Sequence, residues 1–155
     1  MVDSAITQNC SCPCGKSKFQ VLNRPSLRFF CHCSICQRLY KQPFADVTTL
    51  NQNDIILPPD HGIQFKKYRS IVGIDRGTCV ECSKPVIALA GSGTKGLAFI
   101  AAGNYSNMEV LPDPKLHVFY DRRVADVADD LPKYKGYIRS QFAVIRQLNR
   151  SAAGA

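Results

Sequence analysis

The stretch Cys31-His32-Cys33-Ser34-Ile35-Cys36 is the one around which the chain is organised, because it places three thiols within six residues. Five further cysteines lie on either side of it: Cys10, Cys12, Cys14, Cys79 and Cys82. Disulfides within C-x-C and C-x-x-C clusters would be strained, and the N-terminus lacks the basic and apolar segments of a secretion signal. We therefore interpret the clusters as metal sites rather than as disulfides.

The spacing of the outer cysteines predicts a closed metal site. Structural zinc takes four ligands in a tetrahedron, and two paired knuckles supply them well. Four of the outer cysteines form such a set: Cys12, Cys14, Cys79 and Cys82. The central trio, Cys31, Cys33 and Cys36, is then one ligand short, which is the pattern of a catalytic zinc with an exchangeable position. In the alternative interpretation both ions are structural, and Cys10, a histidine or a permanent water completes the central site.

The chemistry of the central trio favours a thiol substrate. Three thiolates give zinc a net negative complex, which is a poor Lewis acid for making hydroxide but accepts a soft sulfur ligand. Zinc lowers the pKa of a bound thiol and holds it as a nucleophile for addition to a carbonyl. A thiol is therefore favoured over a peptide or a phosphate.

Length and composition indicate one globular domain. The chain has 155 residues, of which 45% are hydrophobic and 21% charged. Its net charge of +8 is spread along the sequence, which is more typical of a solvated surface than of a nucleic-acid footprint, so nucleic acid is not the expected partner. The most apolar window, residues 86–103, is broken by glycines and is not a membrane span. We expect a cytoplasmic protein with no membrane partner.

Alternation of apolar and polar residues predicts short strands. Residues 16–30 form two of them, split at Arg24-Pro25, and residues 86–90 and 97–102 form a hairpin. The intervening Gly91-Ser92-Gly93-Thr94-Lys95-Gly96 matches a dinucleotide-binding fingerprint, but the segment after it has strand character, where that fingerprint needs a helix. A further strand is expected over residues 116–120.

The C-terminal segment predicts an amphipathic helix over residues 137–150. Its apolar stripe consists of Ile138, Phe142 and Ile145. The helix packs either on its own domain, which we favour, or on a partner subunit, so that a homo-oligomer through this helix is a second expectation.

At the cysteine motifs the chain resembles the glutathione-dependent formaldehyde-activating enzyme family, which includes centromere protein V relatives. The likeness covers residues 10–134. It lies in Cys12-Pro13-Cys14-Gly15, in the central stretch followed by Gln37-Arg38, in Cys79-Val80-Glu81-Cys82, in Pro43-Phe44, in Leu116-His117-Val118 and in Asp129-Asp130-Leu131-Pro132. A three-part cysteine pattern in this order is specific.

The resemblance implies a mainly β zinc-binding fold called a β-tent, built of short antiparallel strands. It also implies two zinc ions per chain, with a structural zinc on Cys12, Cys14, Cys79 and Cys82 and a catalytic zinc on Cys31, Cys33 and Cys36. The corresponding organisation is a flexible N-terminus (residues 1–9), the zinc-binding β-tent domain (residues 10–134) and a C-terminal helical extension (residues 135–155).

The activity that the resemblance implies is the condensation of glutathione with formaldehyde to S-hydroxymethylglutathione, a carbon–sulfur lyase activity. Arg38 is the candidate residue for a glutathione carboxylate, because a guanidinium pairs with a carboxylate through two hydrogen bonds, although a plain surface arginine is an equal alternative. The alternative function is a non-catalytic zinc-binding module that contacts a protein or nucleic acid through its basic surface.

Three residues depart from the family pattern around the cysteines. Gln37 stands where the family usually has a second basic residue, and Lys41 and Ser83 stand where it usually has glycine. Two histidines receive structural roles. His32, between two ligands in extended chain, should point away from the metal, and His117 should be a hydrogen-bonded core residue.

Overall fold

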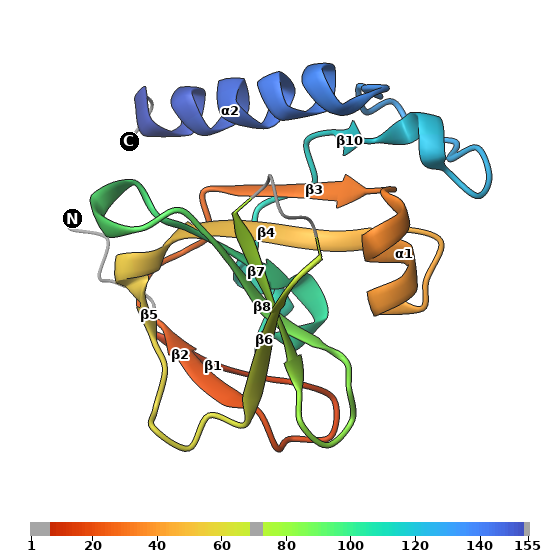
Figure 1. Ribbon diagram of the computed structural model, residues 1–155. Coiled ribbons are helices and arrows are strands. Elements are labelled where there is room, and N and C mark those ends of the chain that lie inside the picture. The colour runs from red at the N-terminus through yellow and green to blue at the C-terminus, as the bar shows by residue number, and fades with distance from the viewer. Residues whose placement is uncertain (1–6, 69–72, 154–155) are drawn as a thin grey trace.

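The computed structural model describes residues 7–68 and 73–153, which form two sheets and two α-helices (Figure 1). The smaller sheet contains, in order, β1 (Gln8–Ser11), β2 (Lys18–Val21) and β5 (Ile55–Ile56). The larger sheet contains, in order, β10 (His117–Val118), β3 (Leu27–Cys31), β4 (Ala45–Asn51), β9 (Leu97–Ala101), β8 (Pro85–Ala90), β7 (Ile74–Cys79) and β6 (Ile63–Lys67). The helices are α1 (Ser34–Tyr40) and α2 (Tyr137–Ala153). The predicted fold class, mainly β with a C-terminal helix, is confirmed.

Strand pairing is antiparallel throughout the described sheets, except that β10 runs parallel to β3. The predicted break at Arg24-Pro25 falls between β2 and β3. The predicted hairpin is formed by β8 and β9, with Ala90 opposite Leu97, so the glycine-rich loop leads into a strand. The strand expected over residues 116–120 is shorter than predicted, because Phe119 has a left-handed backbone (φ 54°) that ends β10 after Val118.

The larger sheet separates two apolar cores. On β4, Leu50 belongs to one core and Val47 to the other, as expected from the alternation of side chains along a strand. The first core lies against the small sheet and contains Phe19, Val21 and Ile100. The second contains Leu27, Phe29 and Leu116, and α2 covers it. The central trio belongs to this second core. Cys10, Cys12 and Cys79 belong to the first, and Cys82 packs against it.

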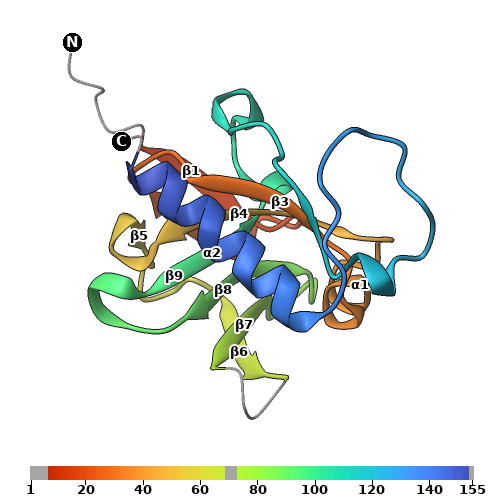
Figure 2. The same cartoon turned by 90° about the horizontal axis from the view of Figure 1, so that it is seen from above.

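Helix α2 crosses over the larger sheet, as predicted for a helix docked on its own domain (Figure 2). The predicted docking stripe is wrong, because the side chains of Ile138, Phe142 and Ile145 are 68%, 63% and 51% exposed. Ser140 and Ala143 are buried instead. Their small side chains let the helix approach the sheet closely, and the Ser140 hydroxyl accepts a hydrogen bond from the N–H of Phe119 at 2.8 Å. Periodicity therefore located the helix but not its inner face.

Two departures from the family pattern have left-handed backbones. Lys41, which ends α1, has φ 51°, and Ser83, which follows the second knuckle, has φ 62°. Glycine adopts this region without steric cost, whereas other residues do so at a penalty. The glycine that the family usually carries at both positions therefore has a conformational reason, and this chain accepts some strain at each turn.

Part of the expected flexible N-terminus, residues 1–6, lies outside the described residues, and β1 begins at Gln8. Within the described ranges, neither helix combines the length and apolar character that crossing a bilayer requires. The boundaries at residues 10, 134 and 135 stay predictions, and so does the name β-tent.

Replacing Ala143 with Glu should lower the free energy of unfolding by about 2 kcal/mol or more, because a carboxylate would be buried under α2 without a partner. The neighbouring change Phe142→Glu should alter it by only about 0.5 kcal/mol, because that side chain is exposed. Urea denaturation followed by circular dichroism measures both. Equal losses in the two variants would contradict the orientation of the helix.

Replacing Lys41 or Ser83 with Gly should raise the free energy of unfolding by roughly 0.5–1 kcal/mol, because each change removes left-handed strain. Lys84→Gly is the matched control, since Lys84 has no left-handed backbone and the change should lower stability through chain entropy. The same denaturation experiment measures all three variants. A loss of stability in Ser83→Gly equal to that in Lys84→Gly would count against this explanation.

Candidate metal centres

The four outer cysteines meet in space although they come from turns far apart in the sequence. Cys12 and Cys14 lie in the turn after β1, where Gly15 has the left-handed φ of 81° that the reversal needs, and Cys79 and Cys82 flank the turn between β7 and β8. The four Sγ atoms lie within 4.8 Å of one another. The Sγ of Cys14 is 3.4 Å from that of Cys12 and 3.6 Å from that of Cys79.

These distances fit a tetrahedral metal. Four sulfurs at 2.3 Å from a zinc ion stand about 3.8 Å apart. Backbone N–H groups point at the sulfurs, from Ser17 to Cys12 at 3.4 Å and from Cys82 to Cys79 at 3.5 Å. Burial raises the pKa of the Cys79 thiol, but hydrogen bonds from the Ser17 hydroxyl and from the backbone N–H groups of Cys82 and Glu81 outweigh it and lower that pKa to about 6. The group can therefore hold a metal ion as thiolates.

The central trio forms a second group on the other side of the sheet. Cys31 ends β3, Cys33 is the N-cap of α1, and Cys36 lies in the first turns of that helix. All three are buried, and their Sγ atoms also lie within 4.8 Å of one another. The Cys33 sulfur accepts the N–H of Cys36 at 3.3 Å. The short helix thus turns two of the ligands toward the third.

The trio favours a thiolate at its centre. Hydrogen bonds from Cys31 and then Cys36 lower the pKa of Cys33, and the positive charge of Arg76 adds to this effect. The pKa of Cys31 is raised in turn, because it shares a proton with Cys33 and then with Cys36, and because it is buried. Three buried sulfurs of this kind fit a soft cation that takes up the negative charge.

Cys10 does not join the trio. It is buried in the first core with Cys12, where its strand pairs with β2 and bridges to Tyr105. Burial raises the pKa of its thiol to about 12, so it is neutral at physiological pH. Within the described residues, neither Cys10 nor a histidine belongs to either cysteine group. The alternative in which one of them closes the central site is therefore not what the structure shows.

His32 and His117 form a hydrogen-bonded chain with Asp129 beside the trio. His32 Nε2 lies 2.8 Å from His117 Nδ1, and His117 Nε2 lies 2.7 Å from the carboxylate of Asp129. We assign protons to both Nε2 atoms, because the carboxylate can only accept. Hydrogen bonds from Lys133 and then His117 lower the pKa of Asp129 to about 2. Both histidines are fully buried, and His117 is a hydrogen-bonded core residue, as predicted. They lie where β3 pairs with β10, beside the ligands.

Gln37, the third departure from the family pattern, has a structural contact of its own. Its side-chain amide donates to the carbonyl of His32 at 2.6 Å and to the carbonyl of Arg122 at 2.7 Å. These bonds fasten α1 to the segment that follows β10. A neutral amide therefore serves this position, where it braces the backbone between Cys31 and Cys33.

A cavity of about 140 Å³ opens in front of the trio. Its walls are mostly apolar and come from β3, α1, β7, β8, β9 and α2. Tyr40 lines it from α1, and burial raises the pKa of this phenol well above its ordinary range, so the hydroxyl stays protonated. Helix α2 contributes Tyr137, Gln141 and Val144. Among the described lining residues, Arg76 is the single charged side chain apart from the cysteines.

The cysteines predicted as site residues lie together in two groups, whereas Arg38 lies apart from both. Arg38 is exposed on α1 and does not belong to the residues that line the cavity, so its role stays a prediction. Arg76, Tyr40 and the wall from α2 were not predicted. Arg76 sits in a strand with no motif around it, and the inner face of α2 carries small and polar residues, so neither gives a sequence signal.

Comparison with known protein families finds a match to the family described as glutathione-dependent formaldehyde-activating enzyme, over residues 7–122. This range contains both cysteine groups and Arg76, and it ends before α2. Comparison with curated proteins gives no match.

Purified protein should contain two zinc ions per chain, one for each cysteine group. Cys82→Ser and Cys33→Ser should each lose one ion, because each removes one thiolate from a different group, whereas Cys10→Ser should keep both. Elemental analysis by mass spectrometry measures the content. If Cys10→Ser lost one of the two zinc ions while its circular dichroism spectrum was unchanged, the assignment of Cys10 to the core would be contradicted.

Proposed function

The chain belongs to the glutathione-dependent formaldehyde-activating enzyme family, and on this basis we propose that it condenses glutathione with formaldehyde to S-hydroxymethylglutathione. In the reverse direction the reaction is that of a carbon–sulfur lyase. The observation that supports the proposal most strongly is the buried trio of Cys31, Cys33 and Cys36, which faces a cavity instead of a fourth cysteine.

The proposal includes two zinc ions per chain with different roles. Cys12, Cys14, Cys79 and Cys82 would hold a structural ion, and the central trio would hold a catalytic one. When bound, the catalytic zinc supplies an electrophilic centre that lowers the pKa of a thiol substrate. Three protein sulfurs supply fewer ligands than the tetrahedral preference, which supports an exchangeable position at the trio.

The reaction forms one S–C bond between the thiol and the carbonyl carbon. The carbonyl double bond becomes a single bond, and the thiol proton ends on its oxygen, so no oxidant or reductant is needed. The apolar walls of the cavity exclude water from the thiolate, and the protonated Tyr40 hydroxyl can donate a hydrogen bond to an oxygen inside the cavity.

The size of the cavity limits how much of glutathione enters. About 140 Å³ is close to the volume of a cavity that takes up a benzene molecule. The thiol arm and formaldehyde fit such a space, whereas the whole tripeptide does not, so part of it extends beyond the cavity. Recognition of glutathione therefore divides between the cavity and the surface around its mouth.

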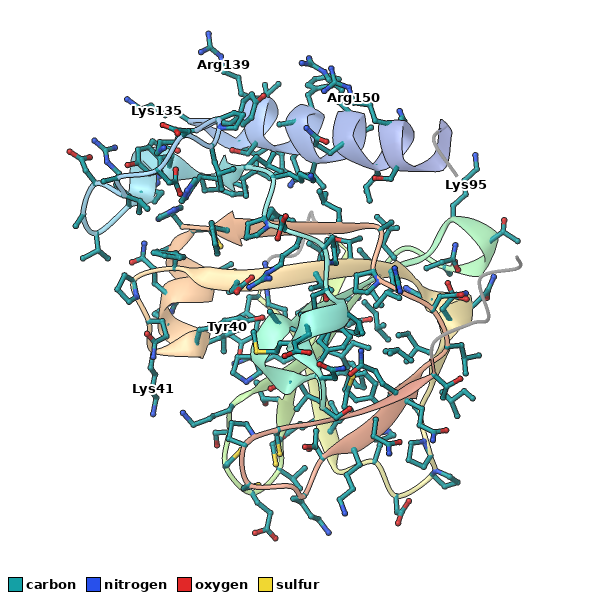
Figure 3. The ribbon with its side chains drawn as sticks, turned by 180° about the vertical axis from the view of Figure 1, so that it is seen from behind. Tyr40, Lys41, Lys95, Lys135, Arg139 and Arg150 are labelled. Carbon is teal, nitrogen blue, oxygen red and sulfur yellow. The ribbon has the colours of Figure 1, made fainter. Side chains whose placement is uncertain are left out.

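The alternative function, a non-catalytic zinc-binding module, is supported by a different feature. Lys135, Arg139 and Arg150 project outward around α2 (Figure 3), beside the exposed side chains of Ile138 and Phe142. A mixed basic and apolar surface suits a protein partner better than nucleic acid, because apolar side chains gain little from phosphate. Self-association through this helix and a cytoplasmic location also stay predictions.

Zinc-loaded protein should accelerate adduct formation above the spontaneous reaction, and Cys31→Ser should reduce the rate to the spontaneous level, because one ligand of the trio is lost. Exchange between free and adducted glutathione, followed by NMR at equilibrium, measures the rate. Cys10→Ser is the control and should keep wild-type activity. Undiminished catalysis in Cys31→Ser would exclude the trio as the active site.

A further inference from the structure

The cavity in front of the trio contains an unpaired cation. Arg76 lies on β7 with Ile74 two residues before it, and both line the cavity, as does Ala88 opposite Arg76 on β8. The arginine is partly buried. In the described part of the chain, no carboxylate lies within ion-pair distance of its guanidinium. The ion pairs there all join aspartates to bases other than Arg76.

A guanidinium among apolar walls lowers the stability of the folded protein unless an anion pairs with it. Removing a charge from water costs several kcal/mol without a partner, and arginine is suited to carboxylates because its planar fork donates two parallel hydrogen bonds. The residue before Arg76 on β7 is Asp75, but its carboxylate is already bound by Lys67 at 2.7 Å. Among the described residues, the trio is therefore the remaining source of negative charge in the cavity, and a bound ligand could supply another.

The trio supplies part of the negative charge that pairs with Arg76. Arg76 and the three sulfurs line the same cavity, so its positive charge and the trio face one space. Three thiolates with one divalent cation still carry a net negative charge, so Arg76 neutralises the filled site. A sulfur-bound metal centre, however, does not use the directional donors of a guanidinium, and these remain available to an oxygen anion in the cavity.

We infer that Arg76 binds a carboxylate of the thiol substrate, so that the site selects thiols that carry a carboxylate within reach of this guanidinium. This inference rests on the proposed function, and it names the substrate class of the same site. A metal ion held by the trio would bind the sulfur of the ligand, and Arg76 would bind its carboxylate. Arg38, which lies outside the cavity, would not be needed for this contact.

The inference is tested with two matched probes, 3-mercaptopropionate and its neutral amide, which differ only in the carboxylate. Isothermal titration calorimetry on zinc-loaded protein measures their dissociation constants. Wild-type protein should bind the carboxylate form roughly tenfold to a hundredfold more tightly, as expected for charge-assisted hydrogen bonds. Arg76→Gln should abolish this difference in affinity, because the guanidinium binds only the probe that carries a carboxylate. Arg76→Lys keeps the positive charge and should keep part of the difference.

The controls separate recognition from structural effects. Arg139→Gln removes the same charge from the outer surface of α2, and it should leave the preference unchanged (Figure 3). Zinc content and circular dichroism establish that each variant is folded and loaded. If Arg76 served only to neutralise the trio, Arg76→Gln would weaken both probes equally.

Three outcomes overturn the inference. Equal binding of the two probes by wild-type protein removes the carboxylate preference but leaves thiol binding, and with it the proposed function, intact. Loss of the preference in Arg38→Gln, with none in Arg76→Gln, moves the carboxylate site to α1. Failure of fully loaded wild-type protein to bind either thiol overturns the proposed function as well.

Discussion

Four sulfur atoms that must share one small volume are the constraint on which the structure depends. Cys14 and Cys79 lie 65 residues apart, yet their Sγ atoms are 3.6 Å apart. Thiolates at this distance repel one another unless protons or a cation take up their charge. The turn after β1 is thus tied to the turn between β7 and β8, and the small sheet is held against the larger one where the first core forms.

The same sheet gives the two cysteine groups different surroundings. The outer group combines the buried Cys12 and Cys79 with the exposed Cys14 and the half-buried Cys82, whereas all three cysteines of the trio are buried in the second core. Backbone N–H groups and neighbouring thiols stabilise charge in both groups. What distinguishes the trio is the cavity beside it, since a group with three sulfurs and adjacent space can accept a ligand, whereas a group of four is complete.

The sequence predicted those parts of the protein that depend on local spacing. The knuckles at Cys12 and Cys79, the break at Arg24-Pro25 and the hairpin of β8 and β9 each follow from a few neighbouring residues, and the structure contains them. The inner face of α2 could not be predicted in this way, because the sheet selects small residues such as Ser140 over the larger apolar stripe. Arg76 was missed because its importance comes only from what the fold places opposite it.

Helix α2 also has a consequence for the order of assembly. Both cysteine groups are complete by Cys82, whereas the last wall of the cavity begins only at Tyr137. Since chains emerge from the ribosome N-terminal end first, a nascent chain exposes the trio to solution before α2 exists to cover it. Synthesis therefore offers an interval in which the trio is open to an ion from solution, before the helix covers it.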